Sequence, residues 1–272
     1  MKYTVIFSFV FLTTFQLYSA EVDMTAKPEP GKQVAQEIEL PKSTSVWETS
    51  GGDIRALLRT SKPLDESAKE DFRFWIFLPN DYDADSTNKT WPLMLFLHGA
   101  GERGTDLAKV KVHGPPQKIE NAEFRDNCQF IIVSPQCPDG NYWSPRQLLM
   151  LLDSLEKTYK IDKKKIFVTG LSMGGFATWM LAAEAPQRFA AAVPICGGGD
   201  SGAASKMVDL PIWAFHGGKD GLVYPELSRE MIEAIEKAGG KKAKLTIYPD
   251  AEHDSWTETY NNPDVYKWML EK

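Results

Sequence analysis

Histidine and cysteine are scarce in this 272-residue sequence, which has four of the first and three of the second. It also lacks any long run of basic residues, and its formal net charge is −6, so we expect no nucleic-acid partner. No segment recurs at the period of a solenoid protein, which argues against a repeat architecture. What remains is an ordinary globular composition, 43% hydrophobic and 25% charged, with enough apolar material for a sizeable core.

Apolar runs long enough to span a membrane are also missing. The uncharged run over residues 5–17 is shorter than the roughly 20 residues that a membrane helix needs. It follows Lys2 and precedes the small residues Ser19 and Ala20, a pattern typical of a secretory signal peptide over residues 1–20. We therefore expect a secreted or periplasmic protein whose mature chain is not stably inserted in a membrane.

The segment after the signal differs in composition from the rest. Residues 21–45 are polar and contain three prolines, which predicts a flexible leader. No other stretch of this kind interrupts the chain. Residues 46–272 are therefore predicted to form a single catalytic domain.

Short apolar runs bounded by turn residues recur along the chain. Most are hydrophobic almost throughout, as expected of strands buried on both faces. Segments with helical patterns separate the later runs, and this alternation predicts an α/β fold with a mainly parallel sheet. The earliest strands are joined by a stretch too short for a crossover helix, which favours an antiparallel arrangement. The predicted strands are residues 53–60, 72–79, 91–99, 130–136, 165–171, 190–198, 211–218 and 244–250, and the predicted helices are residues 144–160, 172–186, 224–240 and 262–272.

The sequence "VTGLSMGG" places Ser172 between Gly170 and Gly174, after a predicted strand and at the start of a predicted helix. Gly-x-Ser-x-Gly occurs by chance, but a strand, a sharp turn and a helix around it form the context of a nucleophile elbow. The amides at the start of the helix also favour developing negative charge near the serine. Ser172 is therefore the predicted nucleophile.

A serine hydroxyl is a weak nucleophile and needs a general base. In this architecture the acid and then the histidine follow the serine in sequence, which excludes the two earlier histidines. His253 follows the last predicted strand, with a strand-end acid between it and Ser172, so it is the predicted base. Asp220, after the strand at 211–218, is the predicted acid that orients His253, with Asp200 as the alternative.

Acyl transfer also needs hydrogen-bond donors for the oxyanion. The amide after the nucleophile, that of Met173, is one predicted donor. The second is expected in the loop after the strand at 91–99, where "LHGAGERG" favours the amide of Ala100, with those of Gly99 and Gly101 as alternatives.

Other side chains near the predicted site allow two interpretations. His98 and His216 are either positioning residues or strand-end histidines with satisfied hydrogen bonds. Trp143 and Trp256 lie in loops expected around the site, where they either bind an acyl group as an aromatic platform or pack beneath the loops. No apolar insertion resembles a lipase lid, so short or water-soluble esters are favoured over lipid surfaces.

Six motifs resemble the α/β-hydrolase serine esterases. The nearest groups are the secreted phospholipase/carboxylesterase and dienelactone-hydrolase-like enzymes, and feruloyl and polyhydroxybutyrate depolymerase-like esterases are more distant. The resemblance covers about residues 70–272 and implies the α/β-hydrolase fold, the triad named above, and Ala100 with Met173 as oxyanion donors. One departure is that the dienelactone hydrolases have a cysteine nucleophile where this chain has Ser172. The motifs are "LHGAGERG" (97–104), "PQCP" (135–138), "GLSMGG" (170–175), "PICGGGD" (194–200), "FHGGKD" (215–220) and "HDSW" (253–256).

The resemblance also implies a strand order in which the strands at 130–136 and 190–195 lie three positions apart. That spacing puts Cys137 and Cys196 beyond easy disulfide reach. Cys128 and Cys137 bracket one predicted strand, which also separates them. We therefore expect three unpaired cysteines.

The residues and the resemblance together predict a carboxylic-ester hydrolase that works through an acyl-enzyme. Its expected substrates are small-molecule or polysaccharide-linked esters with short-chain or aromatic acyl groups, and its expected chemistry uses no metal or organic cofactor. The alternative is a serine peptidase or amidase with the same triad. A noncatalytic binding protein is disfavoured because all three triad positions are filled. The oligomeric state is not predicted.

Overall fold

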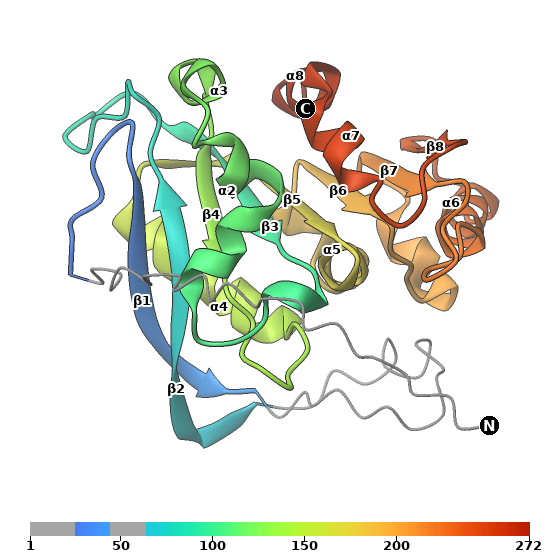
Figure 1. The fold of residues 1–272 in the computed structure, drawn as a ribbon, viewed down its shortest axis with the longest axis horizontal. Helices are drawn as coiled ribbons and strands as arrows, with labels where there is room; N and C mark the ends of the chain where they lie inside the picture. The colour runs from blue at the N-terminus through green and yellow to red at the C-terminus, as the bar shows by residue number, and fades with distance from the viewer. Residues whose placement is uncertain (1–24, 44–63) are drawn as a thin grey trace, which may run out of the picture.

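The computed structural model describes residues 25–43 and 64–272. In these residues an eight-stranded sheet has the order β1-β2-β4-β3-β5-β6-β7-β8 (Figure 1). β1 pairs antiparallel with β2 and β2 antiparallel with β4, whereas the other neighbours are parallel. The predicted α/β class with a mainly parallel sheet is confirmed. The strands are β1 (Gln33–Lys42), β2 (Asp65–Phe77), β3 (Trp91–Leu97), β4 (Ile131–Pro135), β5 (Ile161–Leu171), β6 (Ala191–Ile195), β7 (Ile212–Gly217) and β8 (Ala243–Tyr248).

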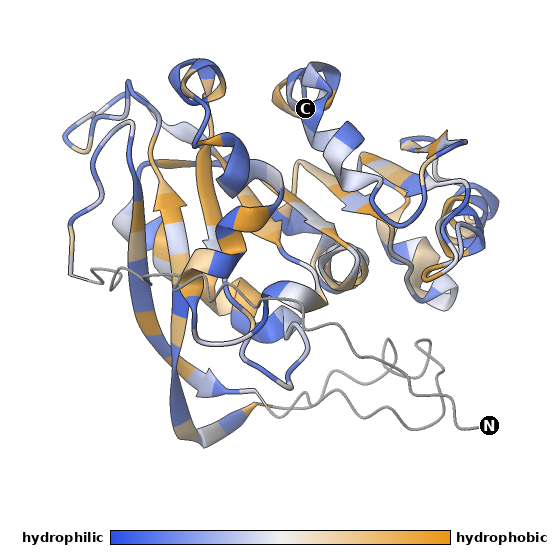
Figure 2. Ribbon diagram, in the orientation of Figure 1, coloured by the Kyte–Doolittle hydropathy of each residue, from blue (hydrophilic) through white to orange (hydrophobic). Residues whose placement is uncertain are grey.

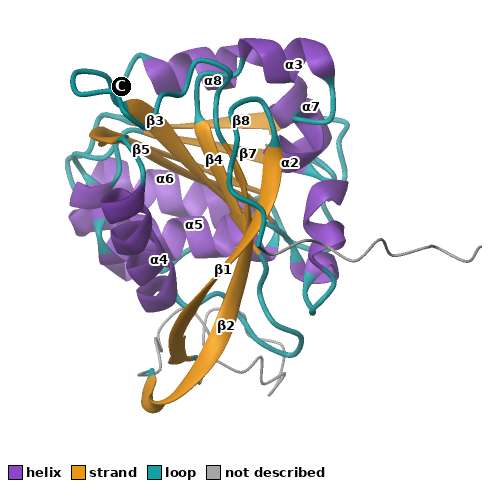
Figure 3. Cartoon of the chain, turned by 90° about the vertical axis from the view of Figure 1, so that its left-hand side faces the viewer, coloured by secondary structure: helices purple, strands orange, loops and turns teal. Residues whose placement is uncertain are grey.

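Helices cover both faces of the sheet. Figure 3 shows α4, α5 and α6 on one face and α2, α3, α7 and α8 on the other. The helix α4 begins as its sequence predicts: Ser144 caps it and Pro145 occupies its first turn. The α-helices are α2 (Gly114–Lys118), α3 (Ala122–Asn127), α4 (Pro145–Thr158), α5 (Met173–Glu184), α6 (Glu226–Lys237), α7 (Trp256–Asn261) and α8 (Pro263–Leu270), and the 3-10 helices are η1 (Ala100–Glu102), η2 (Leu107–Val112), η3 (Pro186–Arg188) and η4 (Ser201–Met207).

The central strands are apolar on both sides because each side faces a helical layer. In β3, Leu93 and Leu95 belong to one core cluster, and Met94 and Phe96 belong to another. Since successive side chains of a strand point to opposite faces, these clusters are the cores on the two sides of the sheet. Figure 2 shows the central strands as continuous hydrophobic ribbons, in contrast to the mixed colouring of β1.

The prediction of a flexible leader over residues 21–45 is wrong for the second half of that segment. Residues 33–42 form β1, which pairs with β2 along its whole length. As an edge strand β1 needs few apolar side chains, and Val34, Ala35 and Leu40 supply them. Pro41 is tolerated because only one side of an edge strand is paired. The packed domain therefore includes residues well before position 46.

Several other expectations can be compared with the fold. The first two strands after the leader do run in opposite directions, although β4 lies between β2 and β3. β4 and β6 lie three positions apart, as expected, and all three cysteines are free. The predicted signal peptide, the first part of the leader and the predicted strand at 53–60 lie outside the described residues. Within the described part, no helix is both long and apolar enough to cross a membrane.

Candidate active site

Ser172 occupies a sharp turn between β5 and α5. Its backbone φ is 52° and ψ is −116°, a region that residues with a side chain rarely adopt. The glycines around it are required by close backbone contacts: a Cβ on Gly174 would lie 1.9 Å from Leu97 O, and one on Gly170 would lie 2.5 Å from Gly174 O. The turn therefore has the geometry of a nucleophile elbow.

His253 and Asp220 lie next to Ser172, as the sequence predicts. The Ser172 hydroxyl is 2.9 Å from His253 Nε2, and His253 Nδ1 is 2.7 Å from Asp220 Oδ2. A carboxylate oxygen can only accept, so Nδ1 carries the proton and Nε2 is free to accept the serine proton. The three residues thus form one hydrogen-bonded chain that ends at a hydroxyl.

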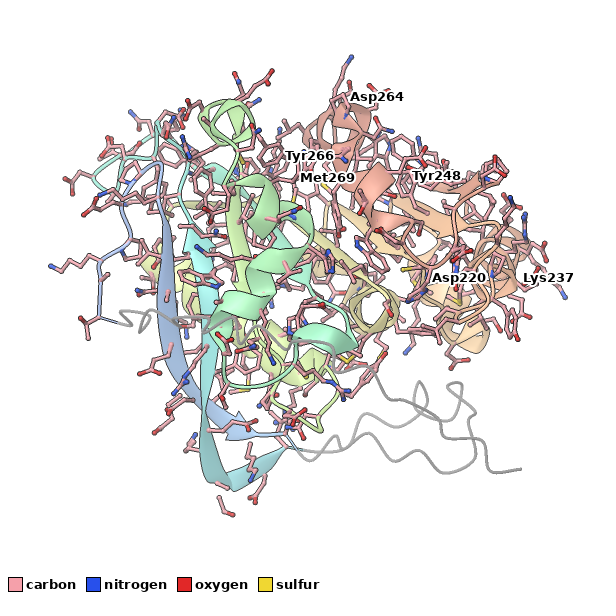
Figure 4. All side chains as sticks on the ribbon, viewed as in Figure 1. Asp220, Lys237, Tyr248, Asp264, Tyr266 and Met269 are labelled. Carbon is pink, nitrogen blue, oxygen red and sulfur yellow. The ribbon has the colours of Figure 1, made fainter. Side chains whose placement is uncertain are left out.

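The carboxyl group of Asp220 is buried and fixed. Asp220 is 3% exposed, and its Oδ1 accepts the backbone N–H groups of Leu222 and Val223, both at 2.9 Å. Figure 4 marks Asp220, which follows β7, and Tyr248, the last residue of the neighbouring β8. The alternative acid, Asp200, accepts the N–H of Gly202 and caps η4. The structure therefore brings Asp220, and not Asp200, to His253.

The loop after β3 packs directly against the serine turn. A Cβ on the buried Gly99 would lie 2.8 Å from Leu171 Cδ1 and 3.7 Å from Ser172 Cβ. Ala100 begins η1 and Met173 begins α5, so neither amide has a partner inside its own helix. The two expected oxyanion donors thus sit at the starts of two helices that adjoin Ser172.

His98 lies beneath this loop and is completely buried. Its Nδ1 lies 2.6 Å from Gly99 O, and its Nε2 accepts the N–H of Cys137 at 3.0 Å. The ring is therefore the neutral tautomer with a proton on Nδ1. Burial lowers the pKa of His98 to about 4, which keeps it neutral.

Comparisons with known proteins agree with this geometry. Residues 143–267 match the Dienelactone hydrolase family. This segment is therefore similar to the dienelactone hydrolases.

The chain is similar to proteins named as an esterase and a depolymerase. It is 25% identical over 194 residues to the bifunctional acetylxylan esterase/xylanase XynS20E of Neocallimastix patriciarum, covering 65% of this chain and 26% of that protein. It is 32% identical over 124 residues to poly(3-hydroxyalkanoate) depolymerase C of Paucimonas lemoignei, covering 39% of this chain and 28% of that protein. The chain thus aligns with about a quarter of the length of these two curated relatives.

The fold of the chain is also similar to that of a solved structure. The crystal structure of a thermostable esterase superposes with a TM-score of 0.66 and 31% identity, covering 76% of this chain and 60% of that one. The fold is that of the α/β-hydrolases. Together the family match, the relatives and this structure indicate a hydrolase.

Trp143 does not form the exposed platform that was one of its two sequence interpretations. It is 1% exposed, and its Nε1 donates to His98 O at 3.1 Å. Its ring packs on that of His98 with centroids 4.7 Å apart. An indole N–H needs a partner when buried, and the backbone of the β3 loop supplies it. Trp143 therefore supports that loop from below.

Trp256 does lie beside the triad. Its ring meets that of His253 edge-on with centroids 5.4 Å apart, and it meets His113 at the same distance on its other side. Trp256 is half-buried. On sequence grounds His113 was set aside because it precedes the serine. Its position beside Trp256 depends on the tertiary fold, since the two residues are far apart in the sequence.

Sequence reasoning also missed Cys196 as a neighbour of the serine. Its Sγ accepts the N–H of Ser172 at 3.2 Å, and the same N–H donates to Ile195 O at 3.0 Å. Cys196 is buried with φ at 40°, and burial raises the pKa of its thiol. Burial also raises the pKa values of Cys128 and Cys137, each to about 12. A thiol with so high a pKa is a poor nucleophile.

Among the described residues, no group of three or more His, Cys, Asp or Glu side chains is arranged to hold a metal ion.

Proposed function

We propose that the protein is a hydrolase of carboxylic esters that uses Ser172 as nucleophile, His253 as general base and Asp220 as the orienting acid. The observation that carries the proposal is the hydrogen-bonded chain from Ser172 through His253 to Asp220, at a serine held with positive φ between β5 and α5. Such a chain activates a hydroxyl that is otherwise a weak nucleophile.

In the proposed reaction, Ser172 Oγ attacks the ester carbonyl carbon while His253 Nε2 takes the hydroxyl proton. The resulting oxyanion accepts hydrogen bonds from the amides of Ala100 and Met173. His253 then gives its proton to the leaving alcohol, and an acyl-enzyme remains on Ser172. Water, deprotonated by His253, attacks the acyl-enzyme and releases the acid. Asp220 stays ionised throughout and stabilises the imidazolium.

We propose short-chain or aromatic acyl esters as substrates, free or linked to a polysaccharide. Trp256 offers an aromatic edge beside His253. Leu222 and Tyr224 lie in the loop that carries Asp220 and are 73% and 64% exposed, so their apolar surfaces are available to a substrate. The names of the two relatives, an acetylxylan esterase/xylanase and a polyester depolymerase, are compatible with esters on polymers. Export to the periplasm or the medium, which the N-terminal sequence predicts, suits such substrates.

The test is hydrolysis of p-nitrophenyl acetate by the wild type and by Ser172→Ala, with Ser201→Ala as a matched control. Ser201 begins η4 and takes no part in the triad hydrogen bonds. We expect Ser172→Ala to lose at least about a thousandfold in kcat and Ser201→Ala to keep wild-type activity. Equal rates for wild type and Ser172→Ala would refute the proposal. Faster cleavage of peptide anilides than of matched esters would instead favour the peptidase or amidase alternative.

A further inference from the structure

His216 is the second completely buried histidine of the described chain, and nothing in the proposed reaction uses it. It lies near the end of β7, four residues before Asp220. Its Nε2 is 2.9 Å from Val223 O and 3.4 Å from Asp220 Oδ2, the oxygen that also accepts from His253. One carboxylate oxygen thus faces two imidazole rings.

The partners of His216 determine where its protons lie. Nε2 faces only acceptors, a carbonyl and a carboxylate, so it carries a proton. Nδ1 lies 2.7 Å from Ser228 Oγ, which is also 3.0 Å from Gly197 O. A hydroxyl has one proton, so Ser228 donates either to a neutral His216 or, when Nδ1 is itself protonated, to Gly197 O. In both arrangements the Nε2–H donates to Val223 O, and Asp220 Oδ2 lies 3.4 Å from the same nitrogen.

We propose that His216 is a positioning residue for the triad: its Nε2–H holds Val223 O, the amide of Val223 holds Asp220 Oδ1, and the polar Nε2–H lies close to Asp220 Oδ2 and reduces the effect of its charge on His253. The inference rests on the proposed function, in which Asp220 orients His253. It goes further in assigning a second histidine to the same carboxylate.

The contacts of His216 also join the segments that carry the triad. Ser228 belongs to α6, and Gly197 lies in the loop after β6. Gly197 packs so closely on the start of α5 that a Cβ on it would lie 2.5 Å from Gly175 C. The chain from His216 through Ser228 to Gly197 therefore connects the acid loop to the helix that follows Ser172.

Two titratable groups face His216: Asp220 from its own loop and His253 from the loop after β8. From α6 it meets the neutral Ser228. Burial, the largest effect, lowers the pKa of His216 from its ordinary 6.5, and Asp220 opposes that shift. His216 is thus a neutral donor at neutral pH.

Nitrogen-15 NMR of histidine-labelled full-length protein tests the proton placement without any activity assay. The chain has four histidines, so its imidazole spectrum is simple, and loss of a signal in His216→Gln assigns His216. We expect His216 to keep the Nε2–H tautomer from pH 6 to 8 and its signal to shift as His253 titrates. An Nδ1–H tautomer of His216, or a His216 chemical shift that stays constant while His253 titrates, would overturn the proposal.

The pH profile of kcat/KM tests the consequence for catalysis. His216→Leu removes the donor, so the Asp220 charge acts more fully on His253 and favours its protonated form. We expect the acid limb to move up by about half to one pH unit and kcat/KM at neutral pH to fall about tenfold. His216→Gln, which keeps an N–H near the Nε2 position, should restore most of both.

An acid limb that stays at its wild-type midpoint in His216→Leu would contradict the proposal, whatever happens to the rate. If His216→Leu does not fold, the NMR measurement on the wild type decides alone. Failure of the proposed function has a different signature, because Ser172→Ala would then retain activity while these spectra stayed as described.

Discussion

Two strand ends of this sheet carry a buried histidine, and the two are used differently. At the end of β3, the hydrogen bonds of His98 are to main-chain groups, the carbonyl of Gly99 and the N–H of Cys137, and the Glu102 carboxylate lies farther away, 3.9 Å from Nδ1. At the end of β7, His216 meets Val223 O and Ser228 Oγ and also faces the charged Asp220. His98 holds main-chain groups of the β3 loop in place, whereas His216 is positioned to hold the carboxylate of Asp220 through Val223. Substitution of His98 should therefore alter the rate without moving its pH profile, and substitution of His216 should alter both the rate and its pH dependence.

The largest expected effect is that of Asp220→Asn in the β7 loop. The amide cannot stabilise the imidazolium and can hold His253 in the wrong tautomer, so kcat should fall by about 10³- to 10⁴-fold. Asp200→Asn is the matched control, because Asp200 only caps η4. Comparable losses in the two variants, measured as kcat on p-nitrophenyl acetate, would break the assignment of the acid.

In the β3 loop, His98→Gln removes the Nδ1 contact that holds Gly99 O, next to the amide of Ala100. Misplacing one oxyanion donor costs about 10²-fold in kcat, and we expect a loss of that order. The acid limb of the pH profile should stay at its wild-type midpoint, in contrast to His216→Leu. A shift of the acid limb in His98→Gln would contradict the proposed difference between His98 and His216.

His98 also makes stability depend on pH. Its pKa is about 4 in the folded protein against an ordinary 6.5, so the unfolded chain binds a proton that the folded protein excludes between these values. The free energy of unfolding should therefore fall as pH decreases from 6.5 toward 4, by about 1 kcal/mol per pH unit from this group. Urea unfolding of wild type and His98→Gln at several pH values measures it. Equal slopes in the two proteins would contradict the assigned burial of a neutral His98.

Trp143→Phe tests whether the indole N–H supports the β3 loop, and its expected effect on kcat is smaller. It removes the indole N–H from His98 O but keeps an aromatic ring on His98. We expect about 1 kcal/mol less stability and a several-fold lower kcat with an unchanged KM. A raised KM with an unchanged kcat would instead restore Trp143 as a substrate-binding residue.

The smallest expected effect concerns the exposed side of the β7 loop. Tyr224→Ala and Leu222→Ser remove apolar surface and keep the donors to Asp220, which are two backbone amides and His253 Nδ1. The KM for an aromatic acyl ester should rise a few-fold, while the KM for the acetyl ester should not change. Equal changes for both esters would show that this surface does not contact the acyl group.

The sequence allowed much of the fold and site to be predicted, and the reasons are specific. Strands buried on both faces are continuous apolar runs, and the glycines around Ser172 reflect backbone contacts that admit no Cβ. The scarcity of histidine then left His253 as the base by elimination. β1 was missed because an edge strand with one paired side needs few apolar residues and resembles a polar leader.

The residues that support the site were harder to predict. Cys196 and Ser228 reach the triad only through the packing of α6 and the loop after β6 against β7. Two interpretations of Trp143 stayed open, because its inward turn depends on the carbonyl of His98, which no local pattern encodes. Local patterns therefore predict the reacting groups well, and they do not reveal the buried contacts that hold those groups in place.

The central claim is that Ser172 forms the covalent intermediate, and labelling with an aryl phosphonate ester tests it most directly. Intact-mass and peptide mass spectrometry should show one phosphonyl group per wild-type chain, on Ser172, with loss of ester hydrolysis in proportion. Ser172→Ala should remain unlabelled. A wild-type protein that hydrolyses esters yet takes up no phosphonyl group, or takes it up on another residue, would contradict the account.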